Sequence, residues 1–82
     1  MTKLEQKLIE LGYEQFEFNQ YEYNKEIEKY NCSLAIIVID DKIESFHMFR
    51  IISIKSQQDI DNLQLAYNEL QKDLEALKEY EK

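Results

Sequence analysis

The chain has 82 residues, of which 44% are hydrophobic, 12% aromatic and 33% charged, the composition of one small globular domain rather than of a disordered segment. Its 17 acidic and 10 basic residues give a formal net charge of −7, whereas a protein that binds nucleic acid through phosphates needs an excess of bases. Composition and charge therefore exclude wholesale disorder and disfavour direct binding to DNA or RNA. They make a basic protein surface the natural electrostatic partner.

Cysteine content and hydropathy indicate the compartment. Cys32 is the single cysteine, so no intrachain disulfide is expected, which is typical of a reducing cytoplasm. The charged N-terminal segment is unlike a signal peptide, and the longest apolar run, residues 34–39, is too short to span a bilayer. We therefore expect a cytoplasmic protein without membrane association. Proline is absent and Gly12 is the only glycine, so a single α+β domain is expected over residues 1–82.

A short helix is predicted over residues 3–11. Thr2 is its expected N-cap, and Gly12 is its expected end because glycine adopts the left-handed conformation freely. The apolar side of this helix is formed by leucines at helical spacing, namely Leu4, Leu8 and Leu11.

Residues 14–30 carry a weaker strand signal. Aromatic and acidic residues alternate with the period of two that indicates a half-buried antiparallel strand. The pair Asn19-Gln20 is an expected turn. A helix over residues 24–30 is the competing interpretation, since Glu and Lys favour helices.

Residues 33–39 are the clearest strand, because the β-branched run at residues 36–39 suits a central strand buried on both faces. A polar turn at residues 40–42 then leads into a long strand over residues 43–54. The order predicts three or four antiparallel strands between two helices, and short turns between the strands allow both helices to lie on one sheet face.

The last predicted helix runs from residue 57 to about Tyr80, with Ser56 as its N-cap. Its expected buried seam alternates steps of three and four residues: Ile60, Leu63, Tyr67, Leu70, Leu74 and Leu77. Three residues are expected to be buried because each lies on the strongest apolar periodicity of its segment: Leu63, Leu70 and Ile37.

Length suggests an overhang of this helix. About 24 helical residues span about 36 Å, whereas a seven-residue strand spans only about 23 Å. The last turns, around Leu74, Leu77 and Tyr80, are therefore expected to project unless the N-terminal helix covers them. A projecting apolar strip would provide a partner groove or a homodimer seam through the C-terminal helix.

No constellation of residues indicates an enzyme. His47 is the only histidine, and Ser45 is its only polar neighbour on the same strand parity, so the orienting group of a catalytic triad is missing. A structural or surface role is expected for His47.

Metal and thiol chemistry are equally poorly supported. Only Lys29 lies close in sequence to Cys32, which is too little to indicate an activated thiol. Asp40, Asp41 and Glu44 lack the spacing and the glycine of a calcium loop. No catalytic, cofactor-binding or metal-binding residue is therefore predicted, and Cys32 is expected to fill space.

Acids and aromatic residues are the remaining functional signal. Six aromatic residues lie in the first 30 positions, and base stacking on them would need basic neighbours where this chain has glutamates. Negative charge concentrates in residues 1–30 (net −3) and 59–82 (net −4) and is balanced in residues 31–58. The two ends are expected to line one acidic surface, either a solubilising coat or a mimic of a nucleic-acid backbone. The predicted partner-binding residues are Tyr21, Glu22, Tyr23, Glu26, Glu69, Asp73, Leu77, Glu79 and Tyr80.

Three segments, residues 8–14 (LIELGYE), 60–66 (IDNLQLA) and 70–74 (LQKDL), resemble small acidic phage and prophage proteins of low-GC Gram-positive bacteria. These segments hold 19 of the 82 residues. The resemblance implies an accessory protein acting in the cytoplasm of the host bacterium. Such proteins are often inhibitors of host machinery, anti-CRISPR proteins among them.

The sequence thus predicts a protein-binding module without enzymatic activity. The leading hypothesis is a phage-encoded inhibitor that occupies a basic surface of a host nucleic-acid enzyme. The alternative is a self-associating structural or regulatory accessory protein without inhibitor activity.

Overall fold

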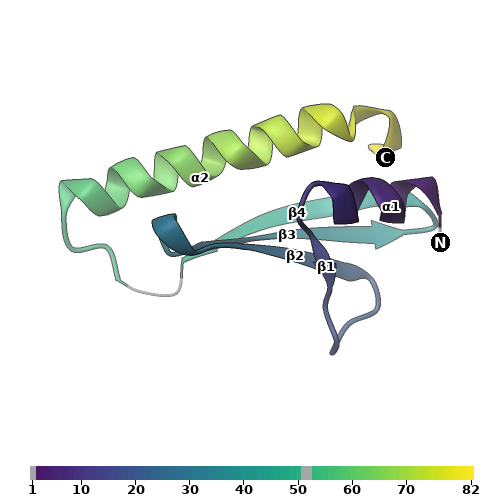
Figure 1. The fold of residues 1–82 in the computed structure, drawn as a ribbon, viewed down its shortest axis with the longest axis horizontal. Helices are drawn as coiled ribbons and strands as arrows, with labels where there is room; N and C mark the ends of the chain where they lie inside the picture. Colours follow the sequence, from purple (N-terminus) through teal and green to yellow (C-terminus); the bar gives the residue numbers. More distant parts are fainter. Residues whose placement is uncertain (1, 51–52) are drawn as a thin grey trace.

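The computed structural model describes residues 2–50 and 53–82 and confirms the α+β class, with a four-stranded antiparallel sheet between a short and a long helix. The strands lie in the order β1-β2-β3-β4, and both helices cover the same sheet face while the β1–β2 connection projects to the other side (Figure 1). The elements are α1 (Lys3–Glu10), β1 (Glu14–Gln15), β2 (Glu22–Ile27), β3 (Cys32–Ile39), β4 (Lys42–Arg50) and α2 (Gln57–Ala76). One 3-10 turn, Glu28–Tyr30, lies between β2 and β3, and another, Lys78–Tyr80, comes after α2.

Local signals define the ends of α1. The Thr2 side chain accepts a hydrogen bond from the Glu5 N–H at 3.2 Å, which confirms the predicted N-cap. Gly12 has φ +99°, and the N–H groups of Gly12 and Tyr13 donate to the Ile9 and Leu8 carbonyls. This is the Schellman arrangement, and it turns Tyr13 back into the core.

The sheet is a meander whose turns also follow from local chemistry. β2 confirms the strand interpretation for residues 22–27, and the competing helix is reduced to one 3-10 turn. Asp40 and Asp41 have φ of +53° and +59°, as a two-residue type I′ hairpin turn requires. The predicted strand over residues 43–54 is too long, since residues 53 and 54 are not in a strand; Ile51 and Ile52 lie outside the described residues.

A β-bulge in β4 changes which side chains reach the core. Ile37 pairs with Ser45 but Val38 pairs with Ile43, so Glu44 is an extra residue in β4. Strict alternation would place Ile43 with Ser45 on the open face. The bulge instead turns Ile43 toward the helices, where it is buried.

The buried stripe of α2 differs from the predicted seam. It runs through Ala66, Leu70, Asp73 and Leu77, which confirms the predicted burial of Leu70 and Leu77. The other predicted core and seam residues are less buried than expected: Leu63, Leu74 and Ile37 are half-buried, and Ile60 and Tyr67 are exposed. A polar residue occupies the centre of the stripe, which a search for apolar periodicity cannot find.

The last turns of α2 do not project, which confirms the alternative that the N-terminal helix covers them. Leu77 is 0% exposed and Tyr80 is half-buried, because α1 and the sheet cover the end of the helix. It is the first turns of α2 that extend beyond the strands (Figure 1). The expected dimer seam around Leu74, Leu77 and Tyr80 is therefore not exposed as an apolar strip.

Candidate protein-binding surface

The β1–β2 hairpin, residues 14–27, projects from the sheet on the side away from the helices (Figure 1). Its tip is held by its own hydrogen bonds. The Tyr21 N–H donates to Asn19 Oδ1 at 3.0 Å, the Glu22 N–H donates to the Asn19 carbonyl at 3.1 Å, and Gln15 Nε2 donates to the Gln20 carbonyl at 2.9 Å. These bonds confirm a turn at Asn19-Gln20 and give the tip a defined conformation without burial.

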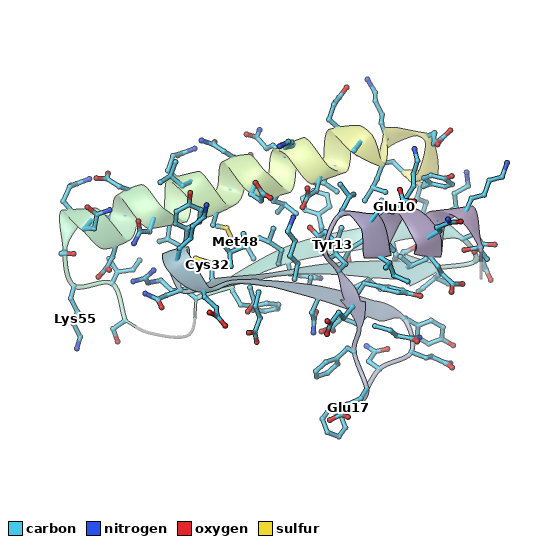
Figure 2. All side chains as sticks on the ribbon, in the orientation of Figure 1. Glu10, Tyr13, Glu17, Cys32, Met48 and Lys55 are labelled. Carbon is cyan, nitrogen blue, oxygen red and sulfur yellow. The ribbon has the colours of Figure 1, made fainter. Side chains whose placement is uncertain are left out.

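Three aromatic rings stand out from this tip. Phe18 is 81% exposed, and Phe16 and Tyr21 are also exposed. The Phe16 and Phe18 rings meet edge to face, with centroids 5.5 Å apart. Figure 2 shows the tip, marked by Glu17, at the point of the molecule farthest from the helices. Exposed rings grouped on an ordered hairpin are typical of a contact surface.

Carboxylates surround these rings. A hollow of about 520 Å³ beside the hairpin is lined by Phe16 and by three acids, Glu14, Glu17 and Glu26. No lysine or arginine lines it. Within residues 2–50 and 53–82, none of these three acids forms an ion pair, and neither does Glu22. The hairpin therefore presents uncompensated negative charge.

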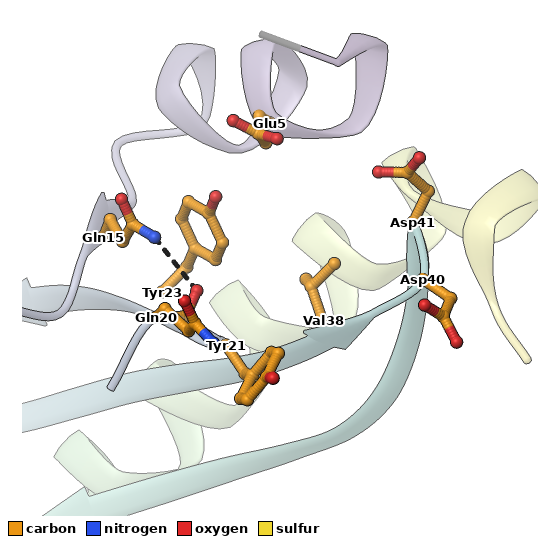
Figure 3. A pocket seen from close by; sticks show the side chains of 8 residues that line it. All are labelled: Glu5, Gln15, Gln20, Tyr21, Tyr23, Val38, Asp40 and Asp41. Carbon is orange, nitrogen blue, oxygen red and sulfur yellow. Dashed lines mark hydrogen bonds between the residues drawn. The ribbon is translucent and has the colours of Figure 1, made fainter.

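A second acidic hollow, of about 340 Å³, lies on the other side of the hairpin (Figure 3). Tyr21 and Tyr23 contribute to its wall. Its three acids are Glu5 from α1 and Asp40 and Asp41 from the β3–β4 turn, and again no basic residue lines it. The two hollows together make both flanks of the hairpin negative.

The alternation of β2 explains why these charges are uncompensated. Tyr23, Lys25 and Ile27 point toward the helices, so Glu22 and Glu26 point toward the open side. Lys25 is the only cation in the hairpin, and its side chain is only 15% exposed because it binds two carboxylates under α2. The single base of this segment therefore neutralises charge on the opposite face.

The predicted partner-binding residues separate into two groups. Tyr21, Glu22 and Glu26 all belong to the hairpin, where Tyr21 lines the second hollow and Glu26 lines the first. The inclusion of Tyr23 was wrong, because it is buried in the core against β3. The prediction that Leu77 binds a partner was also wrong, since this side chain is fully buried between α2 and the rest of the core.

The prediction that Asp73 binds a partner was wrong as well. Asp73 is 2% exposed, and its Oδ2 accepts hydrogen bonds from the Tyr13 hydroxyl and from Lys25 Nζ, both at 2.9 Å. Burial, with the charge and hydrogen bond of Asp73, raises the pKa of Tyr13 well above its ordinary value. Burial alone would lower the pKa of Lys25, but hydrogen bonds with Asp73 and Glu69 raise it. Asp73 therefore stabilises the fold and cannot contact a partner.

The remaining predicted residues lie in the helical layer. Glu69 pairs with Lys25 at 2.9 Å, which lowers the pKa of Glu69. Glu79 pairs with Lys7 at 3.1 Å, and the same lysine lies over the Tyr80 ring. Glu69 and Glu79 are on the opposite side of the sheet from Glu22 and Glu26, so the predicted acidic residues do not all lie on one surface.

Phe16 and Phe18 are exposed at the tip although they are not among the predicted partner-binding residues. They were recognised only as part of an aromatic-rich segment, some of which had to pack in the core. The missed signal is their position within three residues of the Asn19-Gln20 turn, where a hairpin tip extends beyond the sheet.

The single histidine and cysteine occupy different surroundings. His47 is exposed on the open sheet face, 3.2 Å from Ser45 Oγ, and its ring stacks on Phe49. In the described part of the chain, no carboxylate hydrogen-bonds to His47. Cys32 is buried and donates to the Tyr30 carbonyl at 3.3 Å, which confirms its role as a small filler. Among residues 2–50 and 53–82, no group of three His, Cys, Asp or Glu side chains is arranged to hold a metal ion.

No protein-family model, curated protein or solved structure matches the chain. The resemblance to phage proteins is therefore untested and stays a prediction. Neither helix of the described residues combines the length and the apolar character needed to cross a bilayer.

Proposed function

We propose that this chain is a protein-binding module whose β1–β2 hairpin docks on a basic protein surface. One observation carries the proposal: the exposed rings of Phe16, Phe18 and Tyr21 stand among carboxylates that have no ion-pair partner within the described residues. The rings supply apolar area to bury, and the acids supply long-range attraction.

The order of the hairpin tip supports this use. Hydrogen bonds from Tyr21, Glu22 and Gln15 fix the tip before any partner arrives, so little conformational entropy is lost on docking. The same acids oppose a nucleic-acid ligand, because phosphates would be repelled from both hollows that flank the rings.

A host nucleic-acid enzyme is the partner class that we propose to test first. Its basic groove would complement the hairpin in charge, and the resemblance to phage accessory proteins suggests an inhibitor of such machinery. The alternative, a self-associating accessory protein, is favoured by a different feature, the free edge of β4.

The test compares two triple charge reversals. The first converts Glu14, Glu17 and Glu26 of the hairpin to lysine. The control makes the same change in net charge on the helices, at the exposed residues Glu10, Asp61 and Glu75. Each protein is used to capture partners from the lysate of a low-GC Gram-positive bacterium, and binding of the captured protein is then measured with purified components.

We expect the hairpin variant to lose capture and the helix variant to retain it. Equal capture by both variants would show that the acids are only a solubilising coat. Equal loss from both would show that net charge matters and that the hairpin does not.

A further inference from the structure

β4 has one free side. β3 is the one strand that pairs with it among residues 2–50 and 53–82, and β4 is the outermost strand of the sheet. Its first residues are covered, because Ile43 bridges to Glu81 and Glu44 pairs with Lys82 at 2.8 Å. From Ser45 to Arg50, the described residues provide no backbone partner on the outer side.

The register shows which backbone groups point outward. The Val38 N–H donates to the Tyr21 carbonyl at 2.7 Å, so even-numbered residues of β3 direct their polar groups to β2. Residues 33, 35 and 37 then bond to β4, where they oppose residues 49, 47 and 45. The N–H and C=O groups of Phe46 and Met48 are therefore left facing outward.

Apolar side chains flank this edge. Phe46 is 49% exposed on the helix-covered face, since it pairs with the core residue Ile36. Glu69 lies on the flank of α2 that faces β2, because it pairs with Lys25 of that strand. Each residue turns the helix by about 100°, so Tyr67, two positions away, lies about 200° from Glu69 on the other flank. The flank of α2 on the β4 side therefore carries the exposed Ile60 and Tyr67 and the half-buried Leu63 and Leu74.

Charge indicates what covers the edge. Residues 45–49 carry no acid or lysine, and Arg50 is already paired with Asp59 at 2.8 Å. Exposed strand edges usually carry charges or proline that prevent pairing, and this stretch has neither. Two copies with a net charge of −7 repel each other least where acids are absent, whereas a basic partner gains nothing from a neutral edge.

We propose that two copies of this chain join β4 to β4 in antiparallel fashion around a two-fold axis. An antiparallel strand pair is self-complementary, because each strand offers the other the same donors and acceptors. Each four-stranded sheet then continues into the other, with both α2 helices on one face and their apolar flanks meeting near the axis. The acidic hairpins, which lie at the far sheet edges, stay free.

Sedimentation tests the dimer. At submillimolar concentration we expect wild type to sediment at twice the 10.0 kDa mass of one chain. Phe46→Lys places a charge at the edge and is expected to sediment as a monomer with a wild-type circular dichroism spectrum. Phe18→Lys changes an exposed ring on the hairpin in the same way and is expected to remain a dimer.

Hydrogen exchange on wild type provides a test without mutation. The amides of Phe46 and Met48 should be protected at high concentration and should exchange on dilution to the monomer. The amides of His47 and Phe49, which bond to β3, should stay protected throughout. A wild-type monomer at submillimolar concentration, or rapid exchange at Phe46 and Met48 at every concentration, would overturn the proposal.

Discussion

The hydroxyl of Tyr13 donates a 2.9 Å hydrogen bond to Asp73, a buried carboxylate 60 positions away in sequence. Lys25 binds the same carboxylate oxygen and also reaches Glu69, each at 2.9 Å. One polar network thus joins the segment between α1 and β1, the strand β2 and the helix α2 (Figure 2 labels Tyr13 between the helices and the sheet). Buried polar groups stabilise a fold when every member has a partner, as here.

Asp73→Ala should lower the free energy of unfolding by about 3 kcal/mol. This is the lower end of the range for breaking a buried ion pair, because Glu69 remains to pair with Lys25. Tyr13→Phe should cost about 1.5–3 kcal/mol, since one hydrogen bond to a charged group is lost. Urea denaturation measures both, and Glu79→Ala, which removes an exposed ion pair, is the control with little expected effect. Similar midpoints for Asp73→Ala and Glu79→Ala would contradict the role of the network.

Leu70→Ala should cost about 2–5 kcal/mol, because Leu70 is buried in the stripe by which α2 packs on the sheet. Leu65→Ala changes an exposed leucine of the same helix and should leave stability nearly unchanged. Thermal denaturation of both variants tests the orientation of α2. A larger effect at Leu65 than at Leu70 would show that the orientation is wrong.

The contribution of Glu69 to the stability of the fold should vary with pH. Hydrogen bonding to Lys25 lowers the pKa of Glu69 below its ordinary value of 4.5, against the opposing effect of burial. A lowered pKa means that the ion pair stabilises the fold fully above pH 4.5 and loses this contribution as pH falls through the folded-state pKa.

Glu69→Gln should therefore lower the melting temperature at about pH 7 and have much less effect at about pH 3. The effect will be modest, because the Glu69 side chain is 37% exposed and salt screens the pair. Glu75→Gln, at an exposed glutamate with no ion pair in the described residues, is the control. A Glu69→Gln deficit of the same size at both pH values would argue against the ion pair.

Binding kinetics should separate the two components of the hairpin. Reversing Glu14, Glu17 and Glu26 to lysine should mainly slow association with a basic partner, and added salt should slow association of wild type. Phe18→Ala should mainly speed dissociation, because its ring makes the contact after encounter. Surface plasmon resonance resolves the two rates. Unchanged association after the triple reversal would rule out electrostatic steering by the hairpin.

Oligonucleotides should not bind the protein at physiological salt. The exposed rings could stack on bases, but the acids beside them repel the phosphates. Fluorescence anisotropy with single- and double-stranded DNA and RNA checks this. A micromolar dissociation constant for any of them would replace the protein-binding proposal with base stacking.

Much of the fold could be predicted because its signals are local. Thr2 and Ser56 cap the helices as expected, Gly12 ends α1, and the turn at Asp40-Asp41 separates β3 from β4. Each of these depends on the chemistry of residues within a few positions of one another.

What could not be predicted depends on distant partners. Asp73 appears on the polar side of α2 in the sequence, yet Tyr13 and Lys25, 60 and 48 positions away, allow it to be buried. The bulge at Glu44 has no sequence signature, so simple alternation along β4 could not show that Ile43 reaches the core. For the candidate site, alternation identified Glu22 and Glu26 as neighbours, but only the three-dimensional arrangement shows that Glu69 lies across the sheet from them.

The sequential strand order has a consequence for folding kinetics. Every strand pairs with its neighbour in sequence, so the meander closes only short loops, beginning with the two-residue turn at Asp40-Asp41. The Tyr13–Asp73 contact must close a loop of 60 residues and gains little until the sheet exists. The kinetic φ-value of a mutation is the fraction of its effect on stability that already appears in the transition state for folding. We expect φ-values to be high around the β3–β4 turn and low at Asp73. Loss of Asp73 should therefore accelerate unfolding and leave the folding rate nearly unchanged.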